Sequence, residues 1–527
     1  MALYSRERAR RSLFNTIGYR AISLVATMAG YVVLVRALSE QSFGIYSLLY
    51  AFVPVISTVA SLGLELTLKR FQPEYLRAGN AAAAAWLVRI VSFTRLVSNV
   101  LTIGLLLLAW NVIAPLFHLG GYRGDFLLFS PLVLLYFQGR ILEFALASHM
   151  LHRYGVGSNI VSSVSKLLAY AALVTLHALT LQRAIVVDTV AYGLAYLFMR
   201  QAYRRHAPEE VVASAARPPR AQRRRMLSYA LYNNFNDAGS LLLYVQTDNF
   251  FIAALLNAST VGAYAFYTRI NGMISNLTPV RLFENVLQPL FFAVSPEQAH
   301  ERLPRYFTFL VNSGLAVQLP IIAYTSVYHR ELVELLLGGK FATLSWLLPV
   351  IIAFGTTSNV LAIPVTSVAQ YRERPSLILL SQLFGIYQIA AMLLLVPAAG
   401  LLGAAVATGT FHLLRNGFVW WKVRRDARWL NCASVAICSV VIWGGAALIC
   451  QVMKRVLIAP PLVTMVAGLA ICSVAALAYI RSPALSNSDR ELLRQLFHGR
   501  EARLLEKLGV LRPVSTPEPG TSHSLQQ

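Results

Sequence analysis

Long stretches of apolar residues occupy most of this chain and constrain its fold more than any other feature. Apolar residues make up 57% of the sequence and charged residues only 13%, about half the charged fraction of a typical soluble domain. A bilayer core needs about 20 mostly apolar residues in a helix. The charge-poor stretches therefore predict about fourteen membrane-spanning helices, at residues 13–37, 42–67, 85–114, 126–148, 156–178, 183–203, 227–256, 260–290, 304–328, 343–369, 375–396, 400–421, 430–451 and 457–480.

The basic residues of the chain indicate its orientation in the membrane. The net charge is +23, from 46 Lys and Arg residues against 23 Asp and Glu residues. Most of the basic residues fall in alternate connecting segments, at the chain start and in the C-terminal tail, which the positive-inside rule places in the cytoplasm. The charge therefore predicts a multi-pass protein with both termini in the cytoplasm, and it does not indicate a nucleic-acid partner.

The start of the chain and its cysteines predict no processing and no metal chemistry. The first apolar stretch is longer than a signal-peptide core and runs directly into the next one, so we expect no cleavable signal peptide. The cysteines have no metal-ligand spacing and are interpreted as small packing residues. We expect neither a metal site nor a cofactor. The cysteines all lie in the last two apolar stretches, at Cys432, Cys438, Cys450 and Cys472.

Two parts of the chain resemble each other at an offset of 218 residues. The segment SFGIYSLLY at 42–50 aligns with TVGAYAFYT at 260–268, which pairs Gly44 with Gly262 and Tyr46 with Tyr264. Six predicted helices precede the second copy, so both copies enter the membrane in the same direction, as in transporters with parallel repeats. The repeat predicts a six-helix bundle at 1–203, a basic cytoplasmic linker at 204–226, a second six-helix bundle at 227–425, helices 13 and 14 at 426–481, and a cytoplasmic segment at 482–527.

The predicted fold class is an all-α polytopic membrane protein, with two six-helix bundles that face a central cavity and two peripheral helices. Little sequence lies outside the apolar stretches, so no soluble domain is expected. In the last segment, Ser488 and Glu491 have the spacing of a capping box. The apolar residues that follow, as far as Leu508, predict an amphipathic interfacial helix. The tail from Pro513 is expected to be disordered.

Ionisable residues inside the apolar stretches are the main functional signal. A charge in the middle of a membrane helix costs at least about 2.5–3.5 kcal/mol, so it normally faces a cavity or a partner. Helical spacing places several of these charges on polar faces, for example Arg20 with Thr16, Ser23 and Thr27. The sequence therefore predicts a cationic cavity that binds an anionic substrate, lined by Arg20, Arg95, Arg140, Lys166, Arg269 and Arg415.

Each of these residues also has a structural interpretation. Arg140 lies three residues before Glu143 and has the spacing of a local ion pair. The deeper basic residues can pair with Asp237, with Asp248 or with other intramembrane acids. Asp237 and Asp248 are interpreted as counter-ions to the arginines or as sites for a coupling proton or cation. The residues alone do not decide between these alternatives.

Four segments of the chain are distinctive: LFNTIGYRAIS near the start, SEQSFGIYSLLYAF, SLGLELTLKRFQPEY at 61–75 and VQTDNFFIAALLNASTVGAYAFYTRI at 245–270. Together they resemble the oligosaccharide-lipid flippases of the multidrug/oligosaccharidyl-lipid/polysaccharide (MOP) superfamily. The resemblance covers about residues 1–425 and implies a MATE-like arrangement of helices. It also implies that the chain moves undecaprenyl-pyrophosphate-linked sugars across the bacterial inner membrane by alternating access. Asp248 and Arg70 match positions that carry an Asp and a basic residue in the family.

The resemblance implies a lipid-linked oligosaccharide and membrane lipids as partners, and a polysaccharide polymerase or glycosyltransferases as further ones. Two related transporters remain as alternatives: a flippase for the peptidoglycan lipid precursor and a multidrug exporter of the same superfamily. The multidrug exporter is expected to carry an acidic cation site in its first helix, where this chain has Arg20. A membrane enzyme is disfavoured, because the outer loops are short and no Asp-x-Asp motif occurs.

Overall fold

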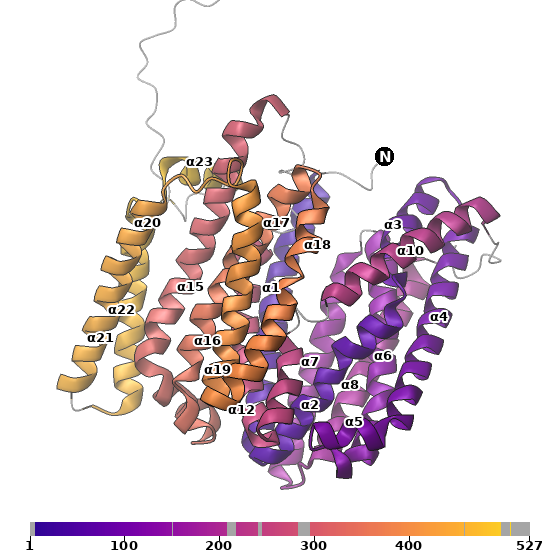
Figure 1. Cartoon of the computed structure of the whole chain (residues 1–527), viewed down its shortest axis with the longest axis horizontal. Helices are drawn as coiled ribbons and strands as arrows, with labels where there is room; N and C mark the ends of the chain where they lie inside the picture. The colour runs from indigo at the N-terminus through magenta and orange to yellow at the C-terminus, as the bar shows by residue number, and fades with distance from the viewer. Residues whose placement is uncertain are drawn as a thin grey trace, which may run out of the picture. The chain divides into compact units, whose positions relative to one another are not determined.

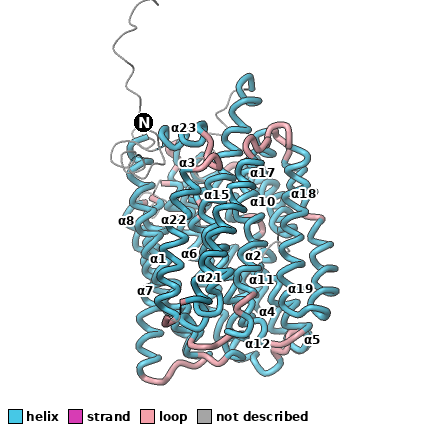
Figure 2. The backbone as a smooth tube through the Cα atoms, turned by 90° about the vertical axis from the view of Figure 1, so that its left-hand side faces the viewer, coloured by secondary structure: helices cyan, strands magenta, loops and turns pink. Residues whose placement is uncertain are grey.

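The described chain is helical throughout. The computed structural model describes residues 6–149, 151–207, 218–240, 245–282, 296–457, 459–496 and 506. Over these residues the tube in Figure 2 shows helices joined by loops and no strand. The predicted all-α fold class is confirmed.

The first half of the chain forms helices that mostly overlap the predicted apolar stretches. They are α1 (Arg6–Ala37), α2 (Glu40–Ser61), α3 (Leu64–Arg77), α4 (Ala81–Leu108), α5 (Trp110–Leu116), the short helix η2 (Gly120–Tyr122), α6 (Arg123–Ser148), α7 (His152–Thr175), α8 (Leu181–His206), α10 (Arg220–Ser240) and α11 (Val245–Leu255).

The helices of the second half include several that are bent or interrupted. They are α12 (Ala258–Leu277), α13 (Pro279–Leu282), η4 (Pro296–Gln298), α15 (Ala299–Leu337), η5 (Ala342–Leu344), α16 (Leu347–Thr356), η6 (Thr357–Leu361), α17 (Ala362–Tyr371), α18 (Pro375–Ser381), α19 (Phe384–Val423), α20 (Cys432–Cys438), η7 (Ser439–Gly444), α21 (Gly445–Val456), α22 (Pro461–Arg481) and α23 (Asn487–Leu496).

Among the described residues, nine helical stretches are long and apolar enough to cross a membrane. One of them, Ser376–Val423, covers two of the predicted spans. Within it, α19 changes direction at Gly400, where φ is 57° and ψ is −133°. Residues other than glycine rarely adopt such a positive φ. Glycine at position 400 therefore permits the break between the two spans. The total of about fourteen spans stays a prediction.

The predicted span at 42–67 is wrong at its C-terminal end. Helix α2 ends at Ser61, because Leu62 and Gly63 both adopt left-handed backbone conformations with φ of 47° and 65°. A Cβ atom on Gly63 would lie 2.0 Å from the carbonyl oxygen of Ala230 on α10. Glycine is therefore required at this turn for both its conformation and its close approach, and α3 begins as a separate helix.

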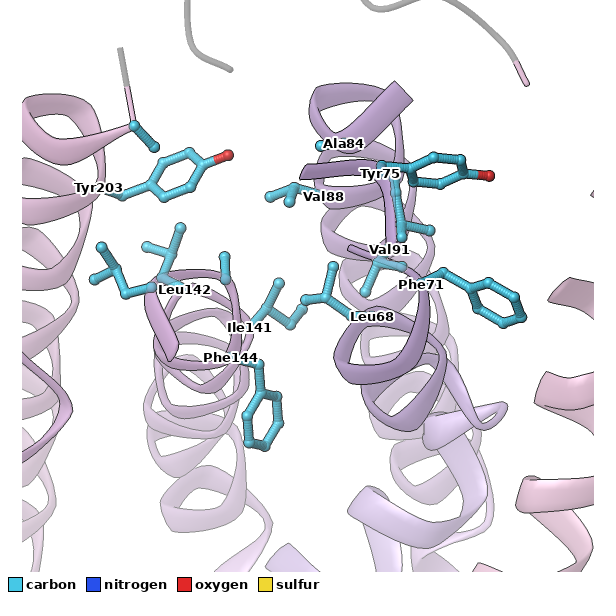
Figure 3. Close-up of a cluster of buried hydrophobic side chains, with 14 of the residues drawn as sticks. Leu68, Phe71, Tyr75, Ala84, Val88, Val91, Ile141, Leu142, Phe144 and Tyr203 are labelled. Carbon is cyan, nitrogen blue, oxygen red and sulfur yellow. The ribbon is translucent and has the colours of Figure 1, made fainter. Parts of the chain in front are cut away.

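The packing divides the chain into two compact units. The first consists of residues 1–273, 332–354 and 379–415, and the second of residues 274–331, 355–378 and 416–527. In the first unit, Leu68 and Phe71 of α3 pack with apolar side chains of α4, α6 and α8, as the close-up in Figure 3 shows for Val88 and Ile141. The boundaries predicted from the repeat are not tested by this division.

The repeat-related segments of α2 and α12 lie against each other within the first unit. A Cβ atom on Gly44 would lie 1.7 Å from the carbonyl oxygen of Ala258, and one on Gly262 would lie 3.3 Å from the Gly44 nitrogen. The Ser259 hydroxyl donates a hydrogen bond to the Glu40 carboxylate at 3.0 Å. Only glycine at position 44 permits this approach of the two helices.

Two basic side chains bind the carbonyl ends of helices near the same contact. The Arg36 Nε of α1 donates to the Leu336 carbonyl of α15 at 2.6 Å. In return, the Lys340 Nζ donates to the carbonyls of Val35 at 3.2 Å and Arg36 at 2.6 Å. A cation stabilises a helix C-terminus because the last carbonyls have no partner within the helix. These hydrogen bonds join segments that are 300 residues apart in sequence.

In the second unit, α23 is attached to the bundle through a buried carboxylate. The capping box predicted at Ser488 and Glu491 is wrong by two residues: the Ser486 hydroxyl accepts from the Asp489 amide at 3.2 Å, and Asp489 accepts from the Ser486 amide at 2.9 Å. Asp489 is fully buried and also accepts from Asn312 of α15 at 2.9 Å. The predicted amphipathic residues after Leu496 and the tail from Pro513 lie outside the described residues, except for Glu506.

Candidate functional site

The carboxylate of Asp188, in the first unit, is held by three tyrosine hydroxyls and one ammonium. The hydroxyl of Tyr46 donates to Oδ2 at 2.6 Å, that of Tyr50 to Oδ2 at 2.5 Å and that of Tyr170 to Oδ1 at 2.6 Å. The Lys166 ammonium lies 3.0 Å from Oδ1. An ionised carboxylate has about four acceptor positions. All four are occupied here, and no part of the Asp188 side chain is exposed.

Helical periodicity explains how three helices bring these groups together. Tyr46 and Tyr50 stand four residues apart on α2, and Lys166 and Tyr170 stand four residues apart on α7, so each pair shares one helix face. Asp188 lies one turn into the apolar part of α8. Helix α8 packs against both α7 and α2, and Figure 1 shows these three helices in neighbouring positions.

The other side of Lys166 carries aromatic rings and a second cation. Its ammonium lies 4.1 Å from the centre of the Tyr192 ring. Helix α1 packs against α7 beside it, where a Cβ atom on Gly30 would lie 3.5 Å from the Cα of Leu167. Arg269 is exposed and lies above the Tyr31 ring. The Lys166 side chain is 19% exposed, so its ammonium is not fully enclosed by Asp188. Through Tyr31, the chain neighbour of Gly30, the predicted site residues Lys166 and Arg269 lie in the same part of the first unit.

Arg95 of α4, by contrast, is enclosed by protein, with 0% of its side chain exposed. Its guanidinium lies 3.6 Å from the Glu65 carboxylate and 4.3 Å from the centre of the Phe137 ring. It also donates to the Ser57 carbonyl at 3.1 Å. These contacts connect α2, α3, α4 and α6. In the conformation described, Arg95 has the surroundings of a structural ion pair, and a ligand reaches it only if these helices rearrange.

Arg140 of α6 forms the local ion pair that its spacing indicated. Its Nη1 lies 3.3 Å from the Glu143 carboxylate, and its guanidinium covers the Phe144 ring. Both charged side chains are part-exposed. Arg140 acts electrostatically on Tyr136, which stacks edge-to-face on Tyr192. The rings of Tyr136 and Tyr192 therefore lie between Arg140 and Lys166. The charge of Arg140 itself is compensated by Glu143.

Arg415 of α19 has no carboxylate partner among the described residues. Its Nε is buried and donates no hydrogen bond to the described protein atoms. One turn earlier on the same helix, the buried ring of His412 is close enough to feel its charge. Arg415 and Arg269 are therefore the two predicted site residues whose positive charge is not compensated within the described chain.

Asp248 of α11 is buried among neutral hydrogen-bond donors. Tyr264 donates to Oδ2 at 3.0 Å, Thr408 donates to Oδ2 at 2.7 Å, and Gln388 donates to Oδ1 at 3.0 Å. No basic side chain of the described residues forms an ion pair with it. The side chains of Arg20 and Asp237 lie outside the described part of the structure. The described chain holds no cluster of three or more metal-ligating side chains.

The sequence of residues 11–294 matches the family described as "Polysaccharide biosynthesis protein". This match covers more than half of the chain. The chain belongs to this family. No protein of curated function shows a significant sequence match.

The fold of this polysaccharide biosynthesis family member is also found in solved transporters. It is similar to the lipid II flippase MurJ in an inward closed conformation, with a TM-score of 0.66 and 10% identity over 91% of this chain and all of that one. It is similar to an inward-facing MATE multidrug transporter of the MOP superfamily, with a TM-score of 0.62 and 14% identity over 78% of this chain and 98% of that one. At these identities the likeness shows the fold alone, and the fold neighbours are a flippase and a transporter.

The central member of the site, Asp188, had no role assigned from the sequence. In the sequence, Asp188 is recognisable only as an acidic residue within the apolar stretch 183–203. Its signal is its isolation, because a lone aspartate in an apolar helix requires partners. Those partners come from α2 and α7 and are 18 to 142 residues away in sequence. Neither the periodicity of α8 nor the repeat indicates which helices face it.

Proposed function

We propose that this protein is a flippase that carries an undecaprenyl-pyrophosphate-linked oligosaccharide across the bacterial inner membrane by alternating access, for O-antigen or exopolysaccharide biosynthesis. The observation that supports this most directly is the charge around Lys166. Lys166 and Arg269 lie in the same part of the first unit, and the described residues there provide one carboxylate, Asp188, which pairs with Lys166. One positive charge in this region is left for an anionic ligand.

The chemistry of the ligand follows from these groups. A diphosphate offers several acceptor oxygens, which an ammonium binds as a point charge and a guanidinium binds with a planar pair of donors. Tyr31 and Tyr192 add rings that are apolar on their faces and polar at their hydroxyls. A lipid-linked pyrophosphate matches this combination, because its head is anionic and its polyprenyl tail remains in the bilayer.

Alternating access is supported by the contact between α2 and α12. The positive-inside orientation places this contact on the extracytoplasmic side, with both termini in the cytoplasm. There the two copies of the repeat approach through Gly44 and Gly262, and Arg36 and Lys340 exchange hydrogen bonds with helix ends. We infer that these contacts close the outer side of the site and separate when the substrate leaves.

Two alternatives belong to the same class of transporter. A peptidoglycan lipid-precursor flippase also accepts a polyprenyl pyrophosphate, and the similarity to MurJ concerns the fold. A multidrug exporter of the superfamily accepts organic cations. The uncompensated charge of Arg269 would repel such a cation and disfavour its binding. The sugar attached to the lipid separates the first alternative from our proposal, and the sign of the ligand charge separates the second.

The test is transport by the purified full-length chain in proteoliposomes that contain an undecaprenyl-pyrophosphate-linked oligosaccharide. Arg269→Gln is expected to lower the initial flipping rate at least about tenfold, the equivalent of 1.4 kcal/mol of lost interaction. Arg305→Gln is the matched control, because Arg305 is an exposed arginine of α15 paired with Glu301. Equal rates for the two variants would contradict the proposed site. Transport of the peptidoglycan precursor or of organic cations instead would favour the alternatives.

Polysaccharide polymerases and glycosyltransferases are the proposed neighbours of this flippase in the membrane, because they consume and supply the same lipid-linked sugar. The basic linker at 204–226 is the proposed contact region on the cytoplasmic side. Co-purification of such an enzyme with the intact chain, and its loss when the arginines of 220–225 are replaced by glutamine, is the corresponding test.

A further inference from the structure

Asp188 carries more hydrogen bonds than a simple ion pair with Lys166 requires. Three tyrosine hydroxyls and one ammonium occupy the acceptor positions of its two oxygens, at 2.5 to 3.0 Å. Two of the tyrosines come from α2 and the third comes from α7. The carboxylate therefore cannot rotate or shift without breaking several charge-assisted hydrogen bonds, each stronger than a neutral one.

A carboxylate held in this way determines where its fourth partner lies. The Lys166 side chain is long and flexible, and an ammonium has three donor hydrogens. Asp188 accepts one of these donors, and the Tyr192 ring lies 4.1 Å from the nitrogen. The part of the ammonium that is not covered by these two contacts keeps donors for another acceptor.

The position of Lys166 is electrostatically unfavourable because a second cation, Arg269, lies in the same part of the first unit, over the Tyr31 ring. Two cations in a membrane interior repel each other, and burial increases that repulsion. The negative charge of Asp188 offsets it. Without Asp188, the Lys166 side chain is expected to turn away from Arg269 or to lose its proton, and in both cases the paired cationic site is lost.

We propose that Asp188, held by Tyr46, Tyr50 and Tyr170, is a positioning residue that fixes the Lys166 ammonium beside Arg269, so that the two cations bind the diphosphate of a lipid-linked substrate together. This inference rests on the proposed function and extends it, because it assigns a role to the buried acid and to the three tyrosines. Asp188 acts through Lys166 and does not contact the substrate.

The experiment is a double-mutant cycle on the full-length chain in nanodiscs, with farnesyl pyrophosphate as the probe and farnesol as the uncharged control. Lys166→Met and Asp188→Asn are each expected to weaken binding of farnesyl pyrophosphate about tenfold, with farnesol binding unchanged. The double variant is expected to bind no more weakly than Lys166→Met, because the second substitution removes a residue that acts only through the first.

Removing both charges together also guards against misfolding. An unpaired buried charge is strongly destabilising, whereas the loss of both partners is often tolerated. If either single variant does not yield folded protein, the double variant and the charge exchange below are still compared with wild type. The exchange Lys166→Asp with Asp188→Lys provides a further readout: it retains an ion pair but moves the cation, and is expected to restore folding without restoring binding.

The possible outcomes separate this inference from the function on which it rests. If wild-type protein does not bind farnesyl pyrophosphate more tightly than farnesol, the proposed function is wrong and the inference falls with it. If wild type binds and the losses from Lys166→Met and Asp188→Asn are additive, or if the charge exchange restores binding, the inference alone is overturned. The Asp125→Asn variant is the matched acid control, because Asp125 is a buried acid that accepts from Gln182, and it is expected to bind the probe like wild type.

Discussion

Tyr46 and Tyr264 occupy equivalent positions of the repeat, and each donates a hydrogen bond to a buried carboxylate. Tyr46 binds Asp188 at 2.6 Å, and Tyr264 binds Asp248 at 3.0 Å. The two carboxylates are not equivalent in the repeat, because Asp188 lies on the last helix of the first copy and Asp248 on the first helix of the second. Only Asp188 has an ammonium among its described partners. The same tyrosine thus supports an ion pair in one copy and a neutral hydrogen-bond cluster in the other.

This difference predicts unequal effects of removing the two hydroxyls. Tyr264→Phe leaves Asp248 with two neutral donors, Gln388 and Thr408, whereas Tyr46→Phe leaves Asp188 with two tyrosines and Lys166. A hydrogen bond to a charged group contributes about 1.5–3 kcal/mol. We expect Tyr264→Phe to lower the unfolding temperature in detergent by several degrees and Tyr46→Phe to lower it less. The reverse order would show that Asp248 does not depend on its hydroxyl partner.

Gly44→Ala is expected to disrupt the contact between α2 and α12. The new methyl group would lie 1.7 Å from the Ala258 carbonyl oxygen, a backbone atom that cannot move by itself. Overpacking of this kind costs about 1–3 kcal/mol, or more when backbone is displaced. Gly104→Ala on α4 is the control, because nothing lies within 4 Å of its Cβ position. A thermal-shift series that ranks Gly104→Ala as the more damaging change would refute this account.

Joining Glu40 to Ser259 is expected to stop transport. Their side chains meet at 3.0 Å across the contact between the repeat copies. Cysteines at these positions, in a background without the native cysteines, are linked by a short bis-methanethiosulfonate, and flipping is measured before and after reduction. Cysteines at Asp125 and Gln182, whose side chains meet at 2.8 Å within the first copy, form the control. Undiminished flipping by the Glu40–Ser259 linked protein would mean that this contact does not open during transport.

Asp248→Asn is expected to uncouple transport from an ion gradient. Among the described residues the buried carboxylate has three neutral donors and no cation, which is a suitable environment for binding and releasing a proton or a small cation. We expect gradient-driven flipping to fall about tenfold or more, with pyrophosphate binding unchanged. Asp125→Asn, which alters a buried acid that accepts from Gln182, is the control. Driven flipping that survives in Asp248→Asn would exclude this carboxyl as the coupling site.

Acidification is expected to strengthen the attachment of α23. Burial raises the pKa of Asp489, and the hydrogen bonds from Asn312 and Ser486 oppose this effect only in part. Because the attached state binds the proton more tightly, its stability is highest below the ordinary carboxyl pKa of about 3.9. It decreases as the pH rises through the raised pKa. Amide-exchange protection of α23 should therefore decrease with pH in this window.

The Asp489→Asn variant is expected to remove most of this pH dependence of α23, since it replaces the titrating group. Glu491→Gln, an exposed acid of the same helix, should leave the dependence in place. Protection that follows pH equally in all three proteins would assign the effect to another group.

The sequence predicts the fold class and shows which charged residues lie in the apolar stretches. It predicts only some of the ion pairs between them. The pairing of Arg140 with Glu143 follows from a spacing of three residues on one helix. Arg95 and Glu65 belong to different helices, and no periodicity relates them. The error at the end of α2 has a similar origin, because the apolar stretch continues beyond Ser61 while Leu62 and Gly63 reverse the backbone.

By itself, the sequence determined that this chain is an all-α membrane protein with basic residues inside its apolar stretches. Those conclusions depend on the amount and spacing of apolar residues, because the thickness and apolarity of the bilayer core set the length and composition of a membrane helix. Only the tertiary structure decided that Lys166 is paired with Asp188, that Arg95 is enclosed and that Arg269 keeps its charge uncompensated within the described chain. Periodicity fixes which residues share a helix face. The packing of the helices decides what that face meets.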